Sequence, residues 1–204
     1  PGTDIHKNDY LDENYAEKIF NNANPRIISV CRLEKRKGLE NTLLALKNFQ
    51  SKYENFKFAI IGDGEEKESL KDQIKNLNLS QNIILFQNMD TQLKNTLIKF
   101  ADFLIMPSIQ VGKSVEGFGI SFLEAAKYGT ASIGGIHGGA SDIIKNKKTG
   151  LLCDGNSHED IYKSLMLIME NNNYKVFGDN AKNYAKLFAW ENQIKKYIDL
   201  IKKH

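Results

Sequence analysis

The sequence has few of the residues that mark several special classes of protein. Its 204 residues include only 2 cysteines, 3 prolines and 1 tryptophan. Cys31 and Cys153 stand alone without metal-ligand spacing, so we expect buried, reduced thiols and a cytosolic setting. No apolar run approaches the ~20 residues that a membrane-spanning helix needs, and the N-terminus lacks the pattern of a signal peptide. A membrane-embedded protein and a cysteine-based metal site are therefore not expected.

The sequence also lacks a strong excess of either charge. Its 28 Lys and Arg residues against 25 Asp and Glu give a formal net charge of +3. No long basic run is interleaved with aromatic residues, so no nucleic-acid partner is expected. Apolar residues make up 41% and charged residues 26%, which is typical of a soluble globular protein. The length suits one large domain, or a domain with an appendage, and the start at Pro1 without Met is consistent with a piece of something longer.

Short apolar segments alternate with amphipathic segments along most of the chain. The expected strands are residues 26–31, 56–61, 82–86, 102–106, 130–134 and 149–153. The expected helices are residues 39–53, 65–77, 91–100, a segment beginning near 120, a short turn near 143, and 157–168, 174–188 and 190–201. Apolar strands alternating with helices predict an α/β fold, a doubly wound parallel sheet of about six strands.

Two glutamates stand eight positions apart across a glycine-bearing turn. Gly117 and Gly119 let the backbone approach a ligand closely, and the free N–H groups of the following helix can receive an anion. Glu116 is expected at the mouth of the turn and Glu124 about two turns into the helix, both facing a crevice at the carboxyl end of the sheet. The alternative is a pair of solvated surface glutamates, because Glu is common in helices.

A basic turn follows the first expected strand. Arg32 and Lys37 flank it, as a diphosphate at the carboxyl end of a sheet would require, and Lys35 and Arg36 lie nearer its tip. A solvated basic turn ahead of a helix is the alternative. No nucleophile elbow, Ser-His-Asp pattern or Walker loop is present in the sequence.

Taken together, these segments resemble the GT-B glycosyltransferases of family 4. Val30–Gly38 is similar to their GRL…KG segment, Ile60–Gly64 to their I-x-G-x-G turn, and Glu116–Glu124 to their E-x7-E motif. Further matches, in order, are Met106-Pro-Ser108, Gly138-Gly139, Thr149-Gly150 and Phe188-Ala-Trp-Glu191. The sequence departs from the family pattern at Cys31, where Gly is usual, at Asp142, where Glu is commoner, and at Gln87-Asn88, where a Gly often follows the third strand.

The resemblance covers nearly the whole chain but only the carboxyl-terminal, donor-binding half of such enzymes. It implies a hinge or linker with a short helix at residues 1–24, a nucleotide-sugar-binding Rossmann-like domain at 25–188, and a crossover helix at 189–204. The N-terminal acceptor domain would be missing. The implied activity is retaining transfer of a hexose, such as mannose, from a nucleotide-diphospho-sugar to a glycan or lipid acceptor.

The resemblance also assigns roles to single residues. Arg32 and Lys37 would hold the diphosphate and offset the charge that builds on the leaving group. Glu116 would bind hydroxyls of the transferred sugar, so Glu116, Arg32 and Lys37 form the expected catalytic group.

Further roles fall on the helix start. Phe118 and Gly119 would offer backbone N–H groups to the donor, and Gly117 would be a further donor-binding residue. Glu124 would bind the ribose hydroxyls, since carboxylate oxygens accept hydrogen bonds from vicinal diols. Additional candidate donor-binding residues are Gly62, Gln87 and Ile120.

No cofactor and no essential metal are expected, because Arg and Lys do the work of a metal; the substrate would be a UDP-, GDP- or ADP-sugar. The implied setting is cytoplasmic, with the full-length enzyme peripheral at the inner face of the membrane. Two alternatives stay open: a non-catalytic module that binds a nucleotide or sugar phosphate, and a Rossmann-type oxidoreductase. The second ranks last because the glycine fingerprint and the acidic ribose ligand after the first strand are both missing.

Overall fold

The computed structural model of the chain describes Asp4 and residues 9–201, and leaves the side chains of residues 196, 197 and 199–201 undescribed. Residues 1–3 and 5–8 of the predicted hinge or linker lie outside this range, as do residues 202–204 of the predicted crossover helix. None of the helices in the described range is long and apolar enough to cross a membrane.

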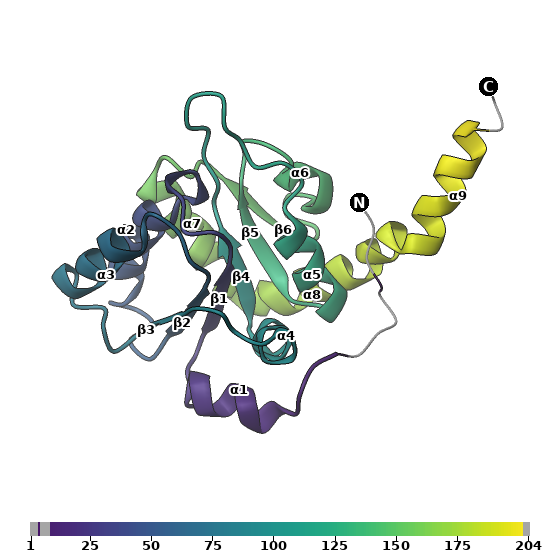
Figure 1. The fold of residues 1–204 in the computed structure, drawn as a ribbon. Helices are drawn as coiled ribbons and strands as arrows, with labels where there is room; N and C mark the ends of the chain where they lie inside the picture. Colours follow the sequence, from purple (N-terminus) through teal and green to yellow (C-terminus); the bar gives the residue numbers. More distant parts are fainter. Residues whose placement is uncertain (1–3, 5–8, 202–204) are drawn as a thin grey trace.

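The centre of the fold is a six-stranded parallel sheet with the order β3-β2-β1-β4-β5-β6 (Figure 1). Its strands are β1 (Arg26–Val30), β2 (Lys57–Ile61), β3 (Ile83–Phe86), β4 (Phe103–Met106), β5 (Ala131–Gly135) and β6 (Gly150–Cys153). Strand β1 is central, since Ile27 pairs with Phe58 of β2 on one side and Phe103 of β4 on the other. The predicted doubly wound parallel sheet is confirmed, and each predicted strand is present within one or two residues.

Helices cover both faces of the sheet. The helical segments are α1 (Glu13–Phe20), η1 (Lys35–Lys37), α2 (Leu39–Phe49), α3 (Lys67–Asn76), α4 (Thr91–Phe100), α5 (Ile120–Tyr128), α6 (Ala140–Ile143), α7 (His158–Met169), η2 (Glu170–Asn172), α8 (Asn173–Ala185), η3 (Lys186–Phe188) and α9 (Trp190–Ile201). Alternate strand residues enter two cores: Phe58 and Ile60 pack under α2, α3 and α7, whereas Ala59 and Ile61 pack under α1, α4, α5 and α8. This burial on both faces explains the nearly continuous apolar strands.

The N-terminal part of the described chain packs outside the sheet. Asp12 caps the start of helix α1, where its side chain accepts a hydrogen bond from the Asn14 N–H. The helix buries Ala16 and Phe20 in the core on the α4 side of the sheet. The short helix predicted within residues 1–24 is therefore present.

The C-terminal helices differ in part from their predicted lengths. The predicted 174–188 helix ends as α8 at Ala185 and continues as the 3-10 turn η3. Helix α9 has the predicted bounds 190–201 and projects from the body of the molecule (Figure 1). Trp190, Ile194 and Ile198 are exposed along it. The amphipathic spacing of this segment predicts that Tyr197, Ile198 and Ile201 are partly exposed when no further domain covers them. Ile198 is exposed, and the side chains of Tyr197 and Ile201 lie outside the described set.

Candidate functional site

The strand order creates one place where a ligand is expected. The chain leaves β1 towards β2 and leaves β4 towards β5, so the loops that follow these neighbouring strands diverge and leave a crevice at their carboxyl ends. An open pocket of about 630 Å³ lies there, which we call the switch-point crevice. Its lining residues are Val30, Cys31, Arg32, Ile61, Gly62, Asp63, Gly64 and Ser121.

The basic turn after β1 is folded tightly against the end of β4. Gly38 closes η1 with a positive φ of 70°, and a Cβ there would meet the Pro107 carbonyl oxygen at 2.2 Å. Only glycine fits this close approach. The approach directs Lys37 into the protein, where it is 6% exposed.

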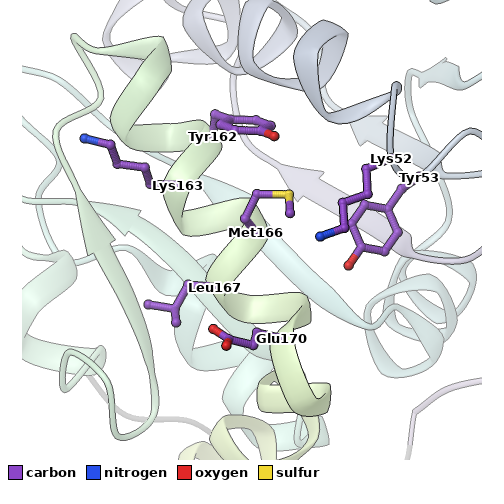
Figure 2. A pocket seen from close by; sticks show the side chains of 7 residues that line it. All are labelled: Lys52, Tyr53, Tyr162, Lys163, Met166, Leu167 and Glu170. Carbon is purple, nitrogen blue, oxygen red and sulfur yellow. The ribbon is translucent and has the colours of Figure 1, made fainter.

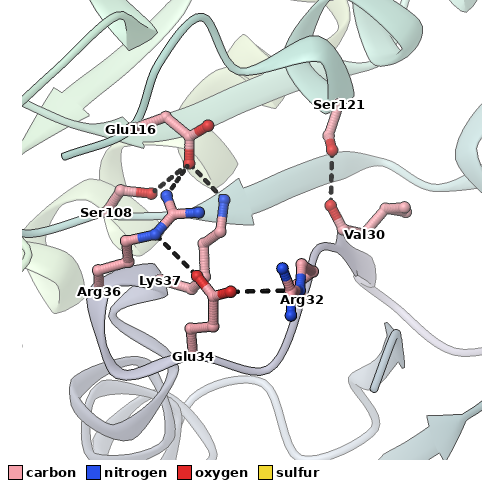
Figure 3. Close-up of polar contacts among 8 residues, drawn as sticks. All are labelled: Val30, Arg32, Glu34, Arg36, Lys37, Ser108, Glu116 and Ser121. Carbon is pink, nitrogen blue, oxygen red and sulfur yellow. Dashed lines mark hydrogen bonds and ion pairs between the residues drawn. The ribbon is translucent and has the colours of Figure 1, made fainter. Parts of the chain in front are cut away.

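Lys37 contacts Glu116, which is itself buried at 8% exposure (Figure 3). The same Glu116 Oε2 lies 3.3 Å from Arg36 Nη1 and accepts a hydrogen bond of 3.3 Å from the Ser108 hydroxyl. A buried carboxylate is costly unless it is paired, and here two cations and a hydroxyl pair it. We call Arg36, Lys37, Ser108 and Glu116 the cationic cluster.

Two residues of the cationic cluster, Glu116 and Arg36, lie elsewhere than the sequence predicts. Glu116 was expected at the mouth of the turn but is buried, because both cations draw it inward. Arg36, placed near the tip of the turn by sequence, points inward instead and its side chain is 21% exposed. Arg32 lines the switch-point crevice as predicted, with a side chain 80% exposed. Lys35 is the exposed cation at the tip.

The start of α5 provides backbone N–H groups beside this cluster. Gly119 precedes the helix with a φ of 75°, and no side chain caps the first turn. Around Gly117, an added Cβ would meet nothing within 4 Å, so the backbone there borders open space. Ile120 is exposed, and the ring of Phe118 packs against Phe188 at 5.9 Å between centroids. An uncapped helix start of this kind favours an anion or an oxygen-rich group.

Glu124 lies apart from the cationic cluster. It is the fifth residue of α5 rather than two turns into it, and its Oε1 accepts a hydrogen bond of 2.7 Å from Lys94 on α4. It lines a separate cavity of about 170 Å³ with Lys94 and Tyr128. Ser121, one turn earlier on the same helix, lines the switch-point crevice and donates to the Val30 carbonyl at 2.6 Å. The structure thus does not bring both glutamates to one cavity.

The two other sequence candidates lie on the β2–β3 side of the site. Gly62 lines the switch-point crevice, and a Cβ there would meet the Cys31 carbonyl oxygen at 1.8 Å, which gives it a packing role. Gln87 is exposed and accepts a hydrogen bond of 2.6 Å from Lys67.

The surroundings of both cysteines favour the protonated thiol. Burial raises the pKa of both Cys31 and Cys153 to about 12, so both thiols stay protonated at neutral pH. Cys153 is buried as predicted, but Cys31 is only half-buried because it faces the crevice. Within the described part of the chain, no group of three or more His, Cys, Asp or Glu side chains could hold a metal ion.

A second pocket lies between α7 and the turn after α2, at the amino end of the sheet (Figure 2). It has a volume of about 390 Å³ and is lined by Lys52, Tyr53, Tyr162, Lys163, Met166, Leu167 and Glu170. None of the residues singled out in the sequence lines it. The switch-point crevice is therefore the better candidate site.

Comparison with known proteins agrees with this fold. The family model described as glycosyl transferases group 1 matches residues 12–184. This chain belongs to that family. It is 31% identical over 189 residues to an uncharacterized glycosyltransferase of Methanocaldococcus jannaschii, covering 91% of this chain and 46% of the relative. It is 25% identical to a GDP-mannose-dependent alpha-(1-6)-phosphatidylinositol monomannoside mannosyltransferase of Mycobacterium tuberculosis, covering 87% of this chain and 47% of the relative.

Solved structures of such proteins share the fold of this group 1 domain. The C-terminal domain of a group 1 protein (LpcC) from Francisella tularensis superposes with a TM-score of 0.76 at 22% identity, covering 91% of this chain and 97% of that one. HepE of Anabaena, solved in complex with UDP, gives a TM-score of 0.84 at 18% identity and covers 100% of this chain but 56% of its own. The chain spans about half the length of the curated relatives it matches. Its fold is that of the C-terminal domain of the group 1 protein from Francisella tularensis.

Proposed function

We propose that this chain binds a nucleotide-diphospho-sugar and forms the donor half of a retaining glycosyltransferase, which transfers a hexose to a glycan or lipid acceptor. The observation that carries the proposal is the cationic cluster beside the switch-point crevice. Lys37 and Arg36 converge there on one buried carboxylate oxygen of Glu116. Two cations held in place by a carboxylate form a site that a diphosphate can enter by replacing that carboxylate as their partner.

The proposed chemistry places charge where the reaction needs it. When the bond between the sugar and the diphosphate breaks, negative charge grows on the departing phosphate oxygen. Lys37 and Arg32 stabilise that charge, and the N–H groups of Phe118 and Gly119 add partial positive charge at the start of α5. Released from its cations, Glu116 accepts hydrogen bonds from hydroxyls of the transferred sugar. No essential metal is needed in this scheme, because side chains supply the positive charge.

Glu124 and Ser121 share one face of α5, because they are three residues apart. Ser121 lines the switch-point crevice. We assign Glu124 to the ribose hydroxyls, with its carboxylate turning from Lys94 towards the crevice on binding.

The names of the similar proteins narrow the choice of donor. One relative is called GDP-mannose-dependent, and HepE was solved with UDP. We therefore rank GDP- and UDP-sugars ahead of ADP-sugars and treat mannose as the first hexose to test.

Calorimetry on the chain with GDP, UDP and ADP, and with their sugar conjugates, tests the proposal. We expect one preferred nucleoside diphosphate, with weak affinity because only half of the expected ligand surface is present. Absence of binding to every one of these ligands at millimolar concentration would overturn the proposal.

A further inference from the structure

The basic turn contains a carboxylate that the proposed function leaves without a role. In the run from Arg32 to Lys37, four of six residues are cationic, and Glu34 is the one acidic residue among them. Cations crowded into so short a turn repel one another. A single carboxylate in their midst therefore has a strong influence on where their side chains lie.

Glu34 holds two arginines at once, one on each carboxylate oxygen (Figure 3). Its Oε1 lies 3.2 Å from Arg32 Nε, and its Oε2 lies 2.8 Å from Arg36 Nε. The Glu34 and Arg36 side chains are 22% and 21% exposed, so solvent screens their pair only in part. Arg32 is 80% exposed, so its pair with Glu34 is screened more strongly. Because both contacts use Nε, the terminal nitrogens of both guanidinium groups can face outward from the carboxylate.

The backbone of the same residue supports the third cation. Glu34 precedes η1, and its carbonyl oxygen accepts a hydrogen bond of 2.9 Å from the Lys37 N–H. One residue thus contacts Arg32 at the edge of the switch-point crevice and both cations of the cationic cluster.

We propose that Glu34 is a positioning residue for diphosphate binding, which holds the Arg32 and Arg36 guanidinium groups apart and oriented before the ligand arrives. This inference rests on the proposed function. Ordering a long side chain on binding carries an entropic cost, and Glu34 removes part of that cost in advance. The carboxylate is itself negative, so its charge alone opposes an anionic ligand. Loss of positioning should weaken diphosphate binding, whereas loss of the negative charge should strengthen it. The sign of the change in diphosphate affinity when Glu34 is replaced therefore tests the proposal.

The test compares Glu34→Gln with the unchanged chain by calorimetry, using the preferred nucleoside diphosphate and the matching nucleoside without phosphate. The Gln amide has one acceptor oxygen and no charge, so it can accept a hydrogen bond from one arginine but cannot pair with both as the carboxylate does. We expect diphosphate binding to weaken about fivefold, because one or two arginine side chains that Glu34 no longer holds must be ordered on binding. Nucleoside binding should not change. Glu40→Gln is the matched control, because it removes the same charge from an exposed residue in the first turn of α2. It should leave diphosphate affinity unchanged or slightly higher.

A second arm repeats Glu34→Gln in a chain that also carries Arg32→Ala and Arg36→Ala. Without the arginines, Glu34 has nothing to position, so the substitution should cause no further loss. Equal or tighter diphosphate binding by the single variant would overturn the inference and leave the proposed function standing, as would an equal loss of nucleoside binding. If the unchanged chain binds none of the nucleoside diphosphates, the proposed function fails and the inference fails with it.

Discussion

Lys37 should contribute more to donor binding than its neighbour Lys35. Lys37 is buried in the cationic cluster, whereas Lys35 is exposed at the tip of the same turn. A hydrogen bond to a charged group is worth about 1.5–3 kcal/mol, so Lys37→Ala should weaken diphosphate binding roughly ten- to a hundredfold. Lys35→Ala, which removes the same charge, should change it little. Calorimetry measures both affinities, and thermal unfolding verifies that each variant is folded.

Equal losses for Lys35→Ala and Lys37→Ala would show a diffuse basic patch instead of a defined phosphate site. Lys37→Ala should also lower stability, because Glu116 then keeps only Arg36 as a charged partner among the contacts described. Binding must therefore be measured well below the unfolding temperature of that variant.

The two glutamates should differ in which ligand they recognise. Glu116→Gln should leave nucleoside diphosphate binding unchanged or tighter, because Lys37 and Arg36 lose a competing anion, and it should weaken binding of the sugar conjugate. Glu124→Gln should weaken binding of both the nucleoside diphosphate and its sugar conjugate, since both contain the ribose. Calorimetry with the diphosphate and its sugar conjugate separates the two patterns. Identical behaviour of the two variants would contradict the assigned roles.

The sequence predicts that Arg32 and Lys37 lie in the turn after the first strand, and the structure places them there. The expected shared crevice of Glu116 and Glu124 is not observed, because Glu116 is buried against Lys37 and Arg36 while Glu124 pairs with Lys94. The inward turn of Arg36 was not predictable, because it depends on Glu116 lying opposite it, eighty residues later in the chain. The roles of these residues stay predictions until binding is measured.

At the scale of elements, the segment before α1 is attached to α4 and α5 by a small polar network. Asp9 Oδ1 accepts hydrogen bonds from the Tyr128 hydroxyl and from Lys127 Nζ, the latter at 3.3 Å. Its backbone oxygen accepts from Asn95 at 3.2 Å. The Tyr10 ring meets the edge of the Tyr128 ring with centroids 5.7 Å apart. Asp9 thus anchors this segment beside the cavity that Glu124 lines.

Asp9→Asn should destabilise the chain at neutral pH, and the effect should fade in acid. Burial raises the pKa of Asp9, but the Tyr128 hydrogen bond and the Lys127 charge outweigh it and lower the pKa below the ordinary 3.8. Its carboxylate therefore contributes stability above pH 3.8, and this contribution is lost as the pH falls through the lowered value. Chemical unfolding at a series of pH values measures the difference between the two chains.

The matched control is Asp12→Asn, because Asn caps a helix about as well as Asp does. It should change stability little at any pH. The difference in free energy of unfolding between Asp9→Asn and the unchanged chain should shrink below pH 3.8. A difference that stays constant there would contradict the predicted role of the Asp9 charge.

Elements were predictable where one physical pattern dominates the local sequence. The apolar strands and helices α4 and α9 were predicted nearly to the residue, since buried parallel strands and amphipathic helices leave clear periodic patterns. Helix α8 was predicted too long. The 3-10 turn at its end has the same apolar spacing as a helix, and nothing in the sequence separates the two.

At the scale of the molecule, the strand order was not derivable from periodicity, because the same alternation fits several parallel arrangements. The observed order places the turn after β1 next to the loop after β4, and this neighbourhood creates the cationic cluster. Helix α9 leaves this body and exposes Trp190, Ile194 and Ile198, four residues apart, on one stripe. Such an exposed apolar stripe is unusual on the surface of a soluble monomer and is typical of a contact surface.

The last prediction is that this chain alone does not transfer sugar. A donor must be aligned with its acceptor and shielded from water, and such orientation can supply about 7–11 kcal/mol of barrier lowering. Under the proposed function the chain provides one wall of that site, and it spans about half the length of the curated relatives it matches. Turnover of a labelled nucleotide-sugar with a membrane extract should therefore appear only with a longer protein that carries an acceptor domain ahead of residue 1. In that longer protein, Lys37→Ala should abolish most of the turnover, whereas Lys35→Ala should not. Transfer by the 204 residues alone would show that they form a complete enzyme.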